Sequence, residues 1–201
     1  MTEAIQPLLD AGLSTSATTL KQWKRLCGSG HLFAIVDACG EKKVPPKCRE
    51  AGPARAISLY RSTSETNAGS PVSSQIVDRK GMVRARPVRP GYAEQYAGIA
   101  PYLMQLDEGL FDWIAGSLWN SPWGIFAYAQ TSLPQLRLHF RRYLKVRHPD
   151  GKVYFFRFYD PRVLPSFLDS CTQAERVQFF GPVVGYGVKN GTDVSMLRLE
   201  S

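Results

Sequence analysis

Short apolar runs alternate along this chain with segments that have helical spacing, and this alternation constrains the fold more than any other feature. The clearest run is Leu32-Phe-Ala-Ile-Val-Asp37, whose nearly continuous hydrophobicity predicts a strand buried on both faces. Further strands are predicted over residues 56–60, 101–106, 123–129 and 153–159. Strands separated by helices are typical of a layered α/β domain with a largely parallel sheet flanked by helices.

Helices are predicted where apolar residues recur every three or four positions. Residues 18–27 have this spacing, with lysine and arginine on the opposite face. Ser132-x-x-Gln135 and Thr172-x-x-Glu175 are capping boxes, in which the hydroxyl accepts from a backbone N–H and the longer side chain accepts in return. Each box therefore predicts the first turn of a helix.

Turn residues mark the ends of other elements. Asp160 followed by Pro161 predicts a helix with aspartate as its N-cap and proline as its first residue. The segments 183–188 and 194–199 flank Asn190-Gly191, a dipeptide favoured in hairpin turns. We therefore expect one antiparallel hairpin at the C-terminal side of the sheet.

The size and composition of the chain limit its class. Its 201 residues, 44% of them hydrophobic, fit a single domain spanning residues 1–201. No apolar run approaches the roughly 20 residues that a membrane-spanning helix needs, and the N-terminal segment lacks the pattern of a secretory signal. We therefore expect a cytoplasmic protein without a membrane partner. Its four cysteines lack the paired spacing of a zinc site, so neither a metal nor a cofactor is expected.

Two segments lack any helical or strand period. Residues 38–55 are rich in proline, glycine and lysine and are predicted to form a loop. Residues 62–95 are dominated by small polar residues and proline, and basic residues gather near their end, among them Arg84, Arg86 and Arg89. Long segments of this kind are usually functional or disordered, so we predict a basic, mobile insertion loop.

Three aspartates follow predicted strands. If those strands were parallel, Asp37, Asp107 and Asp160 would lie along one edge of the sheet, where open α/β folds bind ligands. Such a cluster could hold a divalent cation or act as acid and base. Helix capping explains Asp107 and Asp160 without any catalysis, because each stands directly before a predicted helix. A metal-dependent enzyme is therefore the less favoured alternative.

The common signatures of enzyme active sites are absent from the sequence. It contains no G-x-S-x-G nucleophile elbow, no P-loop and no H-E-x-x-H zinc motif. We predict a protein that is not an enzyme.

Arg157 stands in the middle of the predicted strand 153–159, where an unpaired guanidinium would be costly to bury. Either it pairs with a carboxylate, with Asp37 and Asp107 as candidates, or its face of the strand is open.

The excess of basic over acidic residues makes nucleic acid an alternative partner. The chain has 25 lysines and arginines against 17 acidic residues, a formal net charge of +8. Residues 151–159 are similar to an RNA-recognition strand, in which exposed aromatics stack on bases. The match is poor, because the leading Lys-Gly order is reversed and the small residue between the aromatics is missing. Aromatics in such a run are more often core, so we do not expect nucleic acid to be the partner.

The chain resembles the effector chaperone/adaptor proteins of bacterial type VI secretion (the Tap/TEC type), a family long catalogued as a domain of unknown function. The resemblance covers most of residues 32–183. Its most specific part is the block Phe156-Arg-Phe-Tyr-Asp-Pro-Arg162, with Trp123-Gly-Ile125 upstream and Phe179-Phe-Gly-Pro182 downstream. Weaker parts are Leu32–Asp37, Ser58-Leu-Tyr60, Ala100-Pro-Tyr-Leu103 with Asp107, Ser132-Leu133 and His139-Phe-Arg-Arg142.

The resemblance implies binding rather than chemistry. Members of the family hold a cognate toxic effector in the bacterial cytoplasm and help load it onto the VgrG spike, sometimes with a PAAR-type protein. The family has no established catalytic residues to carry over. The long basic stretch at residues 62–95 departs from its pattern, and the chain ends soon after the Phe-Phe-Gly-Pro block, where many relatives continue.

The candidate site residues fall into two groups. The residues of the family motifs are expected to determine the fold; they are Asp37, Trp123, Arg157, Asp160, Pro161 and Arg162. Contact with the effector is expected at the basic insertion and on the outer face of the helix predicted over residues 133–145; the residues are Arg84, Arg86, Arg89, Arg137, Arg141 and Arg142. Such charges would steer an acidic effector segment toward the adaptor.

Overall fold

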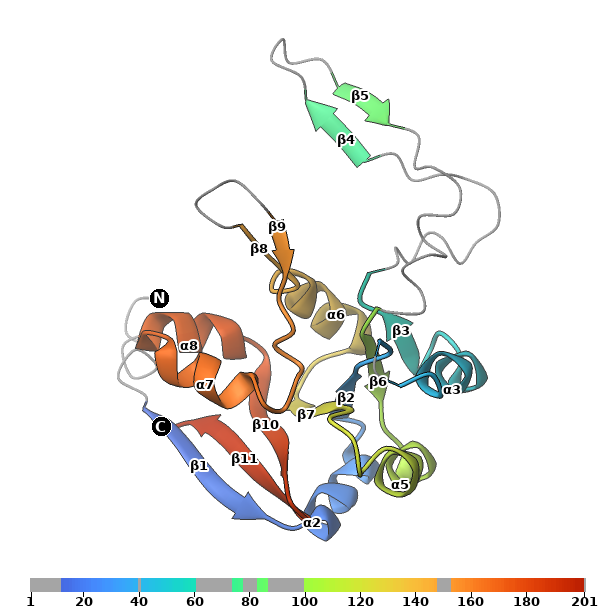
Figure 1. Ribbon diagram of the computed structural model, residues 1–201, viewed down its shortest axis with the longest axis vertical. Helices are drawn as coiled ribbons and strands as arrows, with labels where there is room; N and C mark the ends of the chain where they lie inside the picture. The colour runs from blue at the N-terminus through green and yellow to red at the C-terminus, as the bar shows by residue number, and fades with distance from the viewer. Residues whose placement is uncertain are drawn as a thin grey trace.

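A seven-stranded sheet forms the centre of the protein in the computed structural model, which describes residues 12–39, 41–60, 74–77, 83–86, 100–147 and 153–200 (Figure 1). Its strands, in spatial order, are β1 (Leu13–Thr18), β11 (Asp193–Leu199), β10 (Val183–Asn190), β7 (Gly124–Ala129), β2 (Leu32–Val36), β6 (Tyr102–Gln105) and β3 (Ala56–Ser58). Every neighbouring pair in this sheet is antiparallel.

The prediction of a largely parallel sheet is therefore wrong, and the position of β2 explains why. The helix α5 (Glu108–Ser117) does connect two strands of the same direction, β6 and β7. The central strand β2 lies between them and runs antiparallel to both. The alternation of strands and helices in the sequence thus identified the connection from β6 through α5 to β7. It did not indicate that β2 would lie between these two strands in the sheet.

Two layers of helices cover the two faces of the sheet. One face packs under η1 and three α-helices: α2 (Leu20–Arg25), η1 (Leu26–Ser29), α3 (Val44–Ala51) and α5. The other packs under α6 (Leu133–Arg141), α7 (Leu164–Ser170) and α8 (Gln173–Phe180). Strand β2 contributes Phe33 and Ile35 to the second core and Leu32, Ala34 and Val36 to the first. This confirms that β2 is buried on both faces.

Local capping signals predicted the starts of three helices, α5, α6 and α8. Thr172 and Glu175 form the expected capping box of α8, with Thr172 N–H donating to Glu175 Oε2 at 2.8 Å. The N–H of Ser132 donates to Gln135 Oε1 at the start of α6. Asp107 is the N-cap of α5 and accepts from Leu110 N–H at 2.8 Å. These side chains satisfy backbone donors that have no partner within the helix.

Several elements differ from their predictions. The expected loop 38–55 contains α3, whose two prolines lie in its first turn, where a missing N–H costs nothing. The strand β1 was not predicted at all. The hairpin predicted around Asn190-Gly191 is confirmed by the pairing of β10 with β11.

The strand predicted over residues 153–159 is wrong beyond Phe155. Its first part, β9 (Val153–Phe155), pairs only with β8 (Lys145–Arg147), and together they form a two-stranded ribbon outside the main sheet. The chain then turns into the core, where the Phe158 ring stacks on Phe140 with centroids 5.5 Å apart. Burial of this ring beneath α6 ends the strand, because the chain must leave the ribbon to reach the core.

The predicted insertion at residues 62–95 is described only in part. Within it, β4 (Ser74–Val77) and β5 (Val83–Arg86) form a second antiparallel ribbon. The rest of the insertion lies outside the described residues, so its predicted mobility stays a prediction. Among the helices that the structure describes, none combines the length and hydrophobicity that crossing a membrane requires.

Candidate functional site

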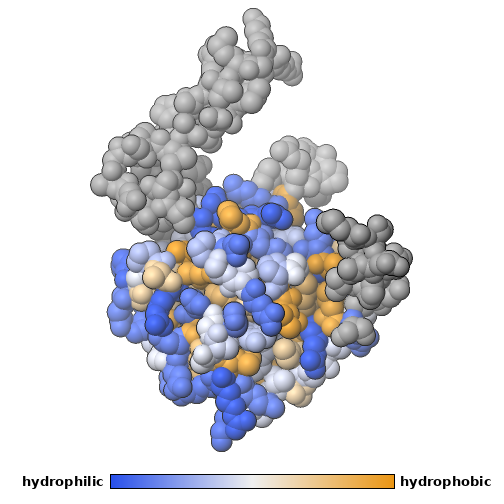
Figure 2. Space-filling view, turned by 180° about the vertical axis from the view of Figure 1, so that it is seen from behind, coloured by the Kyte–Doolittle hydropathy of each residue, from blue (hydrophilic) through white to orange (hydrophobic). Residues whose placement is uncertain are grey.

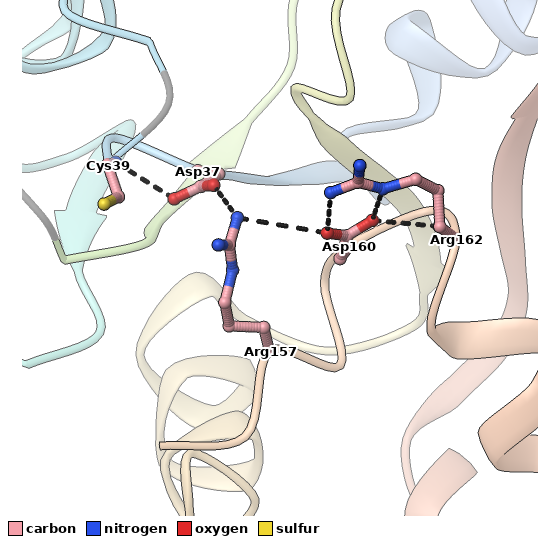
Figure 3. A network of polar contacts seen from close by, with 5 residues as sticks. All are labelled: Asp37, Cys39, Arg157, Asp160 and Arg162. Atoms are coloured by element: carbon pink, nitrogen blue, oxygen red, sulfur yellow. Dashed lines mark hydrogen bonds and ion pairs between the residues drawn. The ribbon is translucent and has the colours of Figure 1, made fainter.

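Four charged residues form a network where the segment after β9 meets the end of β2 (Figure 3). The Arg157 guanidinium donates to Asp37 Oδ2 and lies 3.9 Å from Asp160 Oδ2. Arg162 donates to both oxygens of Asp160, with Nε at 2.9 Å from Oδ1 and Nη2 at 2.6 Å from Oδ2. Of the two carboxylates that the sequence offered to Arg157, the structure selects Asp37.

Both carboxylates of this network are buried and fully partnered. The Asp37 side chain is only 3% exposed, and its Oδ1 accepts from Cys39 N–H at 3.0 Å. Asp160 Oδ1 also accepts from Arg162 N–H at 3.0 Å. Hydrogen bonds from the Arg162 side chain lower the pKa of Asp160, although burial acts in the opposite direction. Since each oxygen already has a donor, the network acts as a clamp between β2 and the segment 157–162.

The structure does not bring the three strand-end aspartates together. Because β2 and β6 are antiparallel, Asp37 and Asp107 follow strands that end at opposite sides of the sheet. Asp107 pairs with Arg55 in addition to capping α5. In the part of the chain that the structure describes, no group of three metal-ligating side chains exists. The acidic cluster, which the sequence offered only as the less favoured alternative and only for parallel strands, is therefore not formed by these three residues.

Asp160 and Pro161 do not start a helix as predicted. They form a turn that precedes α7, which begins at Leu164 with Pro165 in its first turn. The Asp160 side chain accepts from Arg162 N–H, so it caps this turn instead. Pro161 lines a shallow groove of about 260 Å³ between this turn and the strands β1, β10 and β11.

Trp123, the remaining residue of the family motifs, lies in the core. Its side chain is 1% exposed and packs against Phe126, with ring centroids 4.9 Å apart. Its carbonyl accepts from Asp37 N–H at 2.7 Å, so it also positions the clamp. Among the described residues its indole Nε1 has no hydrogen-bond partner.

The basic residues expected to contact a partner fall in different places. Arg137 is 3% exposed and its Nε donates to the Ser58 carbonyl at 2.9 Å, so its placement on the outer face of the helix is wrong. A long side chain can follow the apolar stripe of a helix and bury its head where a carbonyl accepts it. Arg141 and Arg142 are exposed at the end of α6.

Arg84 and Arg86 belong to β5, of which the backbone is described. Arg89 lies outside the described residues.

Exposed apolar side chains cluster on the β8–β9 ribbon. Val146 is 45% exposed, Tyr154 49% and Phe155 54%. We call these three residues, together with the exposed cations Arg141, Arg142 and Lys145, the ribbon surface. Within the described chain, no ion pair joins any of the three cations to an acidic group.

The ribbon surface was not predicted, because aromatics in an apolar run such as residues 153–159 are more often core. The core prediction holds for Phe158 and Tyr159, which are buried. The signal that could have separated the two sets is the position of the chain reversal before Val153, which makes Tyr154 and Phe155 part of a short hairpin. Leu138 is a further exposed apolar residue. It belongs to α6, the helix that Figure 1 shows next to the ribbon.

On the face of the molecule that Figure 2 shows, apolar areas lie among hydrophilic ones. Isolated apolar residues of this kind are normal on soluble proteins. The ribbon surface differs because one short ribbon exposes apolar side chains on both faces, with Val146 and Tyr154 on one and Phe155 on the other, close in sequence to exposed cations.

Comparison with known protein families finds a match for part of the chain. Residues 90–178 match the model of a family described as a domain of unknown function (DUF4123). The matched region includes β6, β7, α6, the β8–β9 ribbon and the Arg157–Asp160–Arg162 part of the clamp. No curated protein matches significantly. No solved structure does so either.

Proposed function

We propose that this protein is an adaptor that holds another polypeptide, namely a type VI secretion effector chaperone that binds a cognate toxic effector and helps load it onto the VgrG spike, with or without a PAAR-type protein. The observation that carries the proposal is the ribbon surface. It combines exposed apolar side chains with cations that have no ion pair in the described chain.

The composition of the ribbon surface suits a polypeptide partner. Burying a fully exposed Val or Phe side chain contributes about 1.5–3 kcal/mol, and the three apolar residues here are about half exposed. Surface ion pairs add only about 0–1 kcal/mol each. The apolar side chains would therefore supply most of the affinity, while Arg141, Arg142 and Lys145 would speed the encounter with an acidic segment.

The clamp supports the same proposal. Its residues Asp37, Arg157, Asp160 and Arg162 satisfy one another, so these family-motif residues have a structural role in the proposal. They fix the segment that leaves β9 to the end of β2 and would thereby orient the ribbon. The part of the proposal that names type VI secretion rests on the resemblance of the sequence, since the matched family has no described function.

The proposal is tested by co-expressing the protein with the toxin encoded beside it. The expected result is a stable one-to-one complex that survives affinity purification and gel filtration. Reversing Arg141 and Arg142 to glutamate should slow association and flatten its salt dependence. The matched control reverses Lys21 and Arg25, which are exposed on α2 and change the net charge equally. A neighbouring toxin that is exported without ever binding this protein would contradict the proposal.

A nucleic-acid partner is the second candidate, because Tyr154 and Phe155 are exposed beside cations, as in proteins that stack bases on aromatic rings. This candidate predicts binding of a single-stranded oligonucleotide that weakens steeply with salt. Fluorescence anisotropy with labelled oligouridine and oligothymidine, from 50 to 300 mM salt, separates it from the adaptor.

A further inference from the structure

We infer that the outer edge of β8 accepts an extended acidic segment of the partner as a third strand of the ribbon. This inference rests on the proposed function and specifies how the partner is held. Two-stranded ribbons are marginally stable on their own and gain from a third strand. Addition of a peptide strand to an open edge is a recurring mode of recognition.

The register of the ribbon shows which backbone groups face outward. Phe156 N–H donates to the Leu144 carbonyl at 2.9 Å, so these two residues form a hydrogen-bonded pair. In an antiparallel ladder such pairs alternate with pairs whose N–H and C=O point away from the partner strand. Lys145 opposes Phe155 in the next pair, so the N–H and C=O of Lys145 point away from β9. In the described chain its backbone has no hydrogen-bond partner.

The side chains of the ribbon define the chemistry of the segment that fits. Val146 and Tyr154 are cross-strand partners and share one face of the ribbon. Lys145 and Phe155 share the other face, with Lys145 Nζ 5.7 Å from the centroid of the Phe155 ring. A third strand that alternates apolar and acidic residues would place the apolar ones beside Val146 and the carboxylates beside Lys145. Arg141 and Arg142 extend the positive charge toward α6.

Two variants at one position separate the backbone contact from the charge. Lys145→Ala removes the cation and retains the outward N–H. Lys145→Pro removes the cation and the outward N–H together. It leaves the hydrogen bonds to β9 intact, because proline is tolerated where the N–H points away from the ladder. The probe is a synthetic nine-residue peptide that alternates glutamate with valine or phenylalanine, and the same peptide with lysine replacing glutamate is its control.

The acidic peptide should bind the native protein, shift the Lys145 amide resonance and protect it from exchange, whereas the lysine peptide should not. Loss of one surface charge in Lys145→Ala should weaken binding about two- to fivefold. Lys145→Pro should bind about fivefold more weakly again, as expected for one backbone hydrogen bond. Equal affinity of the two variants, or equal binding of both peptides, would overturn strand addition.

A second measurement keeps the test decisive if Lys145→Pro disturbs the ribbon. Peptides N-methylated at alternate positions lose the donors of one edge only. Methyl groups on the peptide N–H groups that face β8 should abolish binding to the native protein. Methyl groups on the N–H groups that face away from β8 should leave binding unchanged. Equal effects of the two sets would overturn the inference, as would tighter binding of an oligouridine than of the acidic peptide.

The same variants distinguish this inference from the adaptor function. If the toxin binds Lys145→Pro and Lys145→Ala with the same affinity, strand addition is wrong and the adaptor function stands. If the toxin does not bind the native protein, the adaptor function fails, and the peptide measurements still decide whether β8 accepts a strand.

Discussion

Arg157 donates to the buried carboxylate of Asp37 and thereby joins the segment that follows β9 to the end of the central strand β2. The two residues are 120 positions apart in the sequence. Their contact lies beside the place where the chain leaves the exposed ribbon and enters the core. Loss of this pair should therefore affect both the stability of the protein and the orientation of the ribbon.

Arg157→Ala should destabilise the protein by about 2 kcal/mol. The substitution leaves the Asp37 carboxylate buried with only the Cys39 N–H as a donor. The expected cost is below the 3–5 kcal/mol of a fully enclosed pair, because 44% of the Arg157 side chain is exposed and water can partly replace it. Urea unfolding followed by circular dichroism measures the change. Arg141→Ala is the control and should stay within about 0.5 kcal/mol of the native protein; equal midpoints for both variants would contradict a role for the clamp.

Asp160→Asn should reduce stability at pH 7 and have a smaller effect at pH 3. Arg162 holds the folded-state pKa of Asp160 below its unfolded value, so the ionised carboxylate stabilises the fold above the unfolded pKa. That contribution disappears as the pH falls through the folded-state pKa. At pH 7 the variant should lose about 2 kcal/mol, the scale of hydrogen bonds to a charged group. The urea-unfolding midpoints of the native protein and of Asp160→Asn should approach each other as the pH is lowered from 7 to 3. A difference that stays constant over this range would contradict the stabilising role of the ionised Asp160 carboxylate.

His139 should make the protein less stable as the pH falls below about 6.5, the ordinary pKa of histidine. Its ring is buried, and its Nε2 lies 2.8 Å from the Phe179 carbonyl, to which the nitrogen donates. Burial lowers the pKa of His139; the hydrogen bond to the Phe179 carbonyl partly opposes this shift, and the charge of Arg142 adds a smaller lowering. The unfolded chain therefore binds a proton more readily than the folded one, and acid favours unfolding.

His139→Gln tests this pH dependence, because glutamine can donate to the Phe179 carbonyl without titrating. The variant should lose less of its stability than the native protein between pH 7.5 and pH 5, as measured by the urea midpoint at each pH. Parallel midpoint curves for the two proteins would show that His139 does not titrate on unfolding.

Alanine at Gly124 and at Gly116 should have opposite effects. Gly124 has φ +148°, and a Cβ there would lie 2.0 Å from the Ile35 carbonyl oxygen of the neighbouring strand. Gly116 lies on the exposed side of α5 with nothing within 4 Å of the corresponding position. Gly124→Ala should cost more than about 3 kcal/mol, whereas Gly116→Ala should stabilise the protein by about 0.5–1 kcal/mol. Thermal unfolding compares the two; a tolerated Gly124→Ala would mean that β2 and β7 approach less closely.

Short-range signals in the sequence were sufficient for most helix starts and for the terminal hairpin. The Thr172–Glu175 box and the Asp107 cap depend on residues three positions apart, so they can be recognised without knowing the rest of the fold. The continuous apolar run 32–36 likewise identified a strand that both helical layers cover.

Features set by distant parts of the chain could not be predicted in this way. The insertion of β2 between β6 and β7 depends on pairing across more than sixty residues, and without it the alternation of strands and helices predicts a largely parallel sheet. Arg137 is buried because the Ser58 carbonyl lies over α6, which no helical periodicity reveals. The position where the strand after Val153 ends is likewise set by a tertiary contact, the stacking of Phe158 on Phe140.

The place of β2 in the sheet has a consequence for the protein during its synthesis. Its two neighbours, β6 and β7, are translated after the whole insertion, so the ribosome adds roughly 90 more residues before both edges of β2 can pair. At a synthesis rate of about 5–20 residues per second, the apolar strand β2 remains unpaired with β6 and β7 for on the order of 5–20 seconds. The length of the insertion sets much of that delay, so trimming it would shorten the interval in which the nascent chain is open to misassembly while leaving every strand of the central sheet untouched.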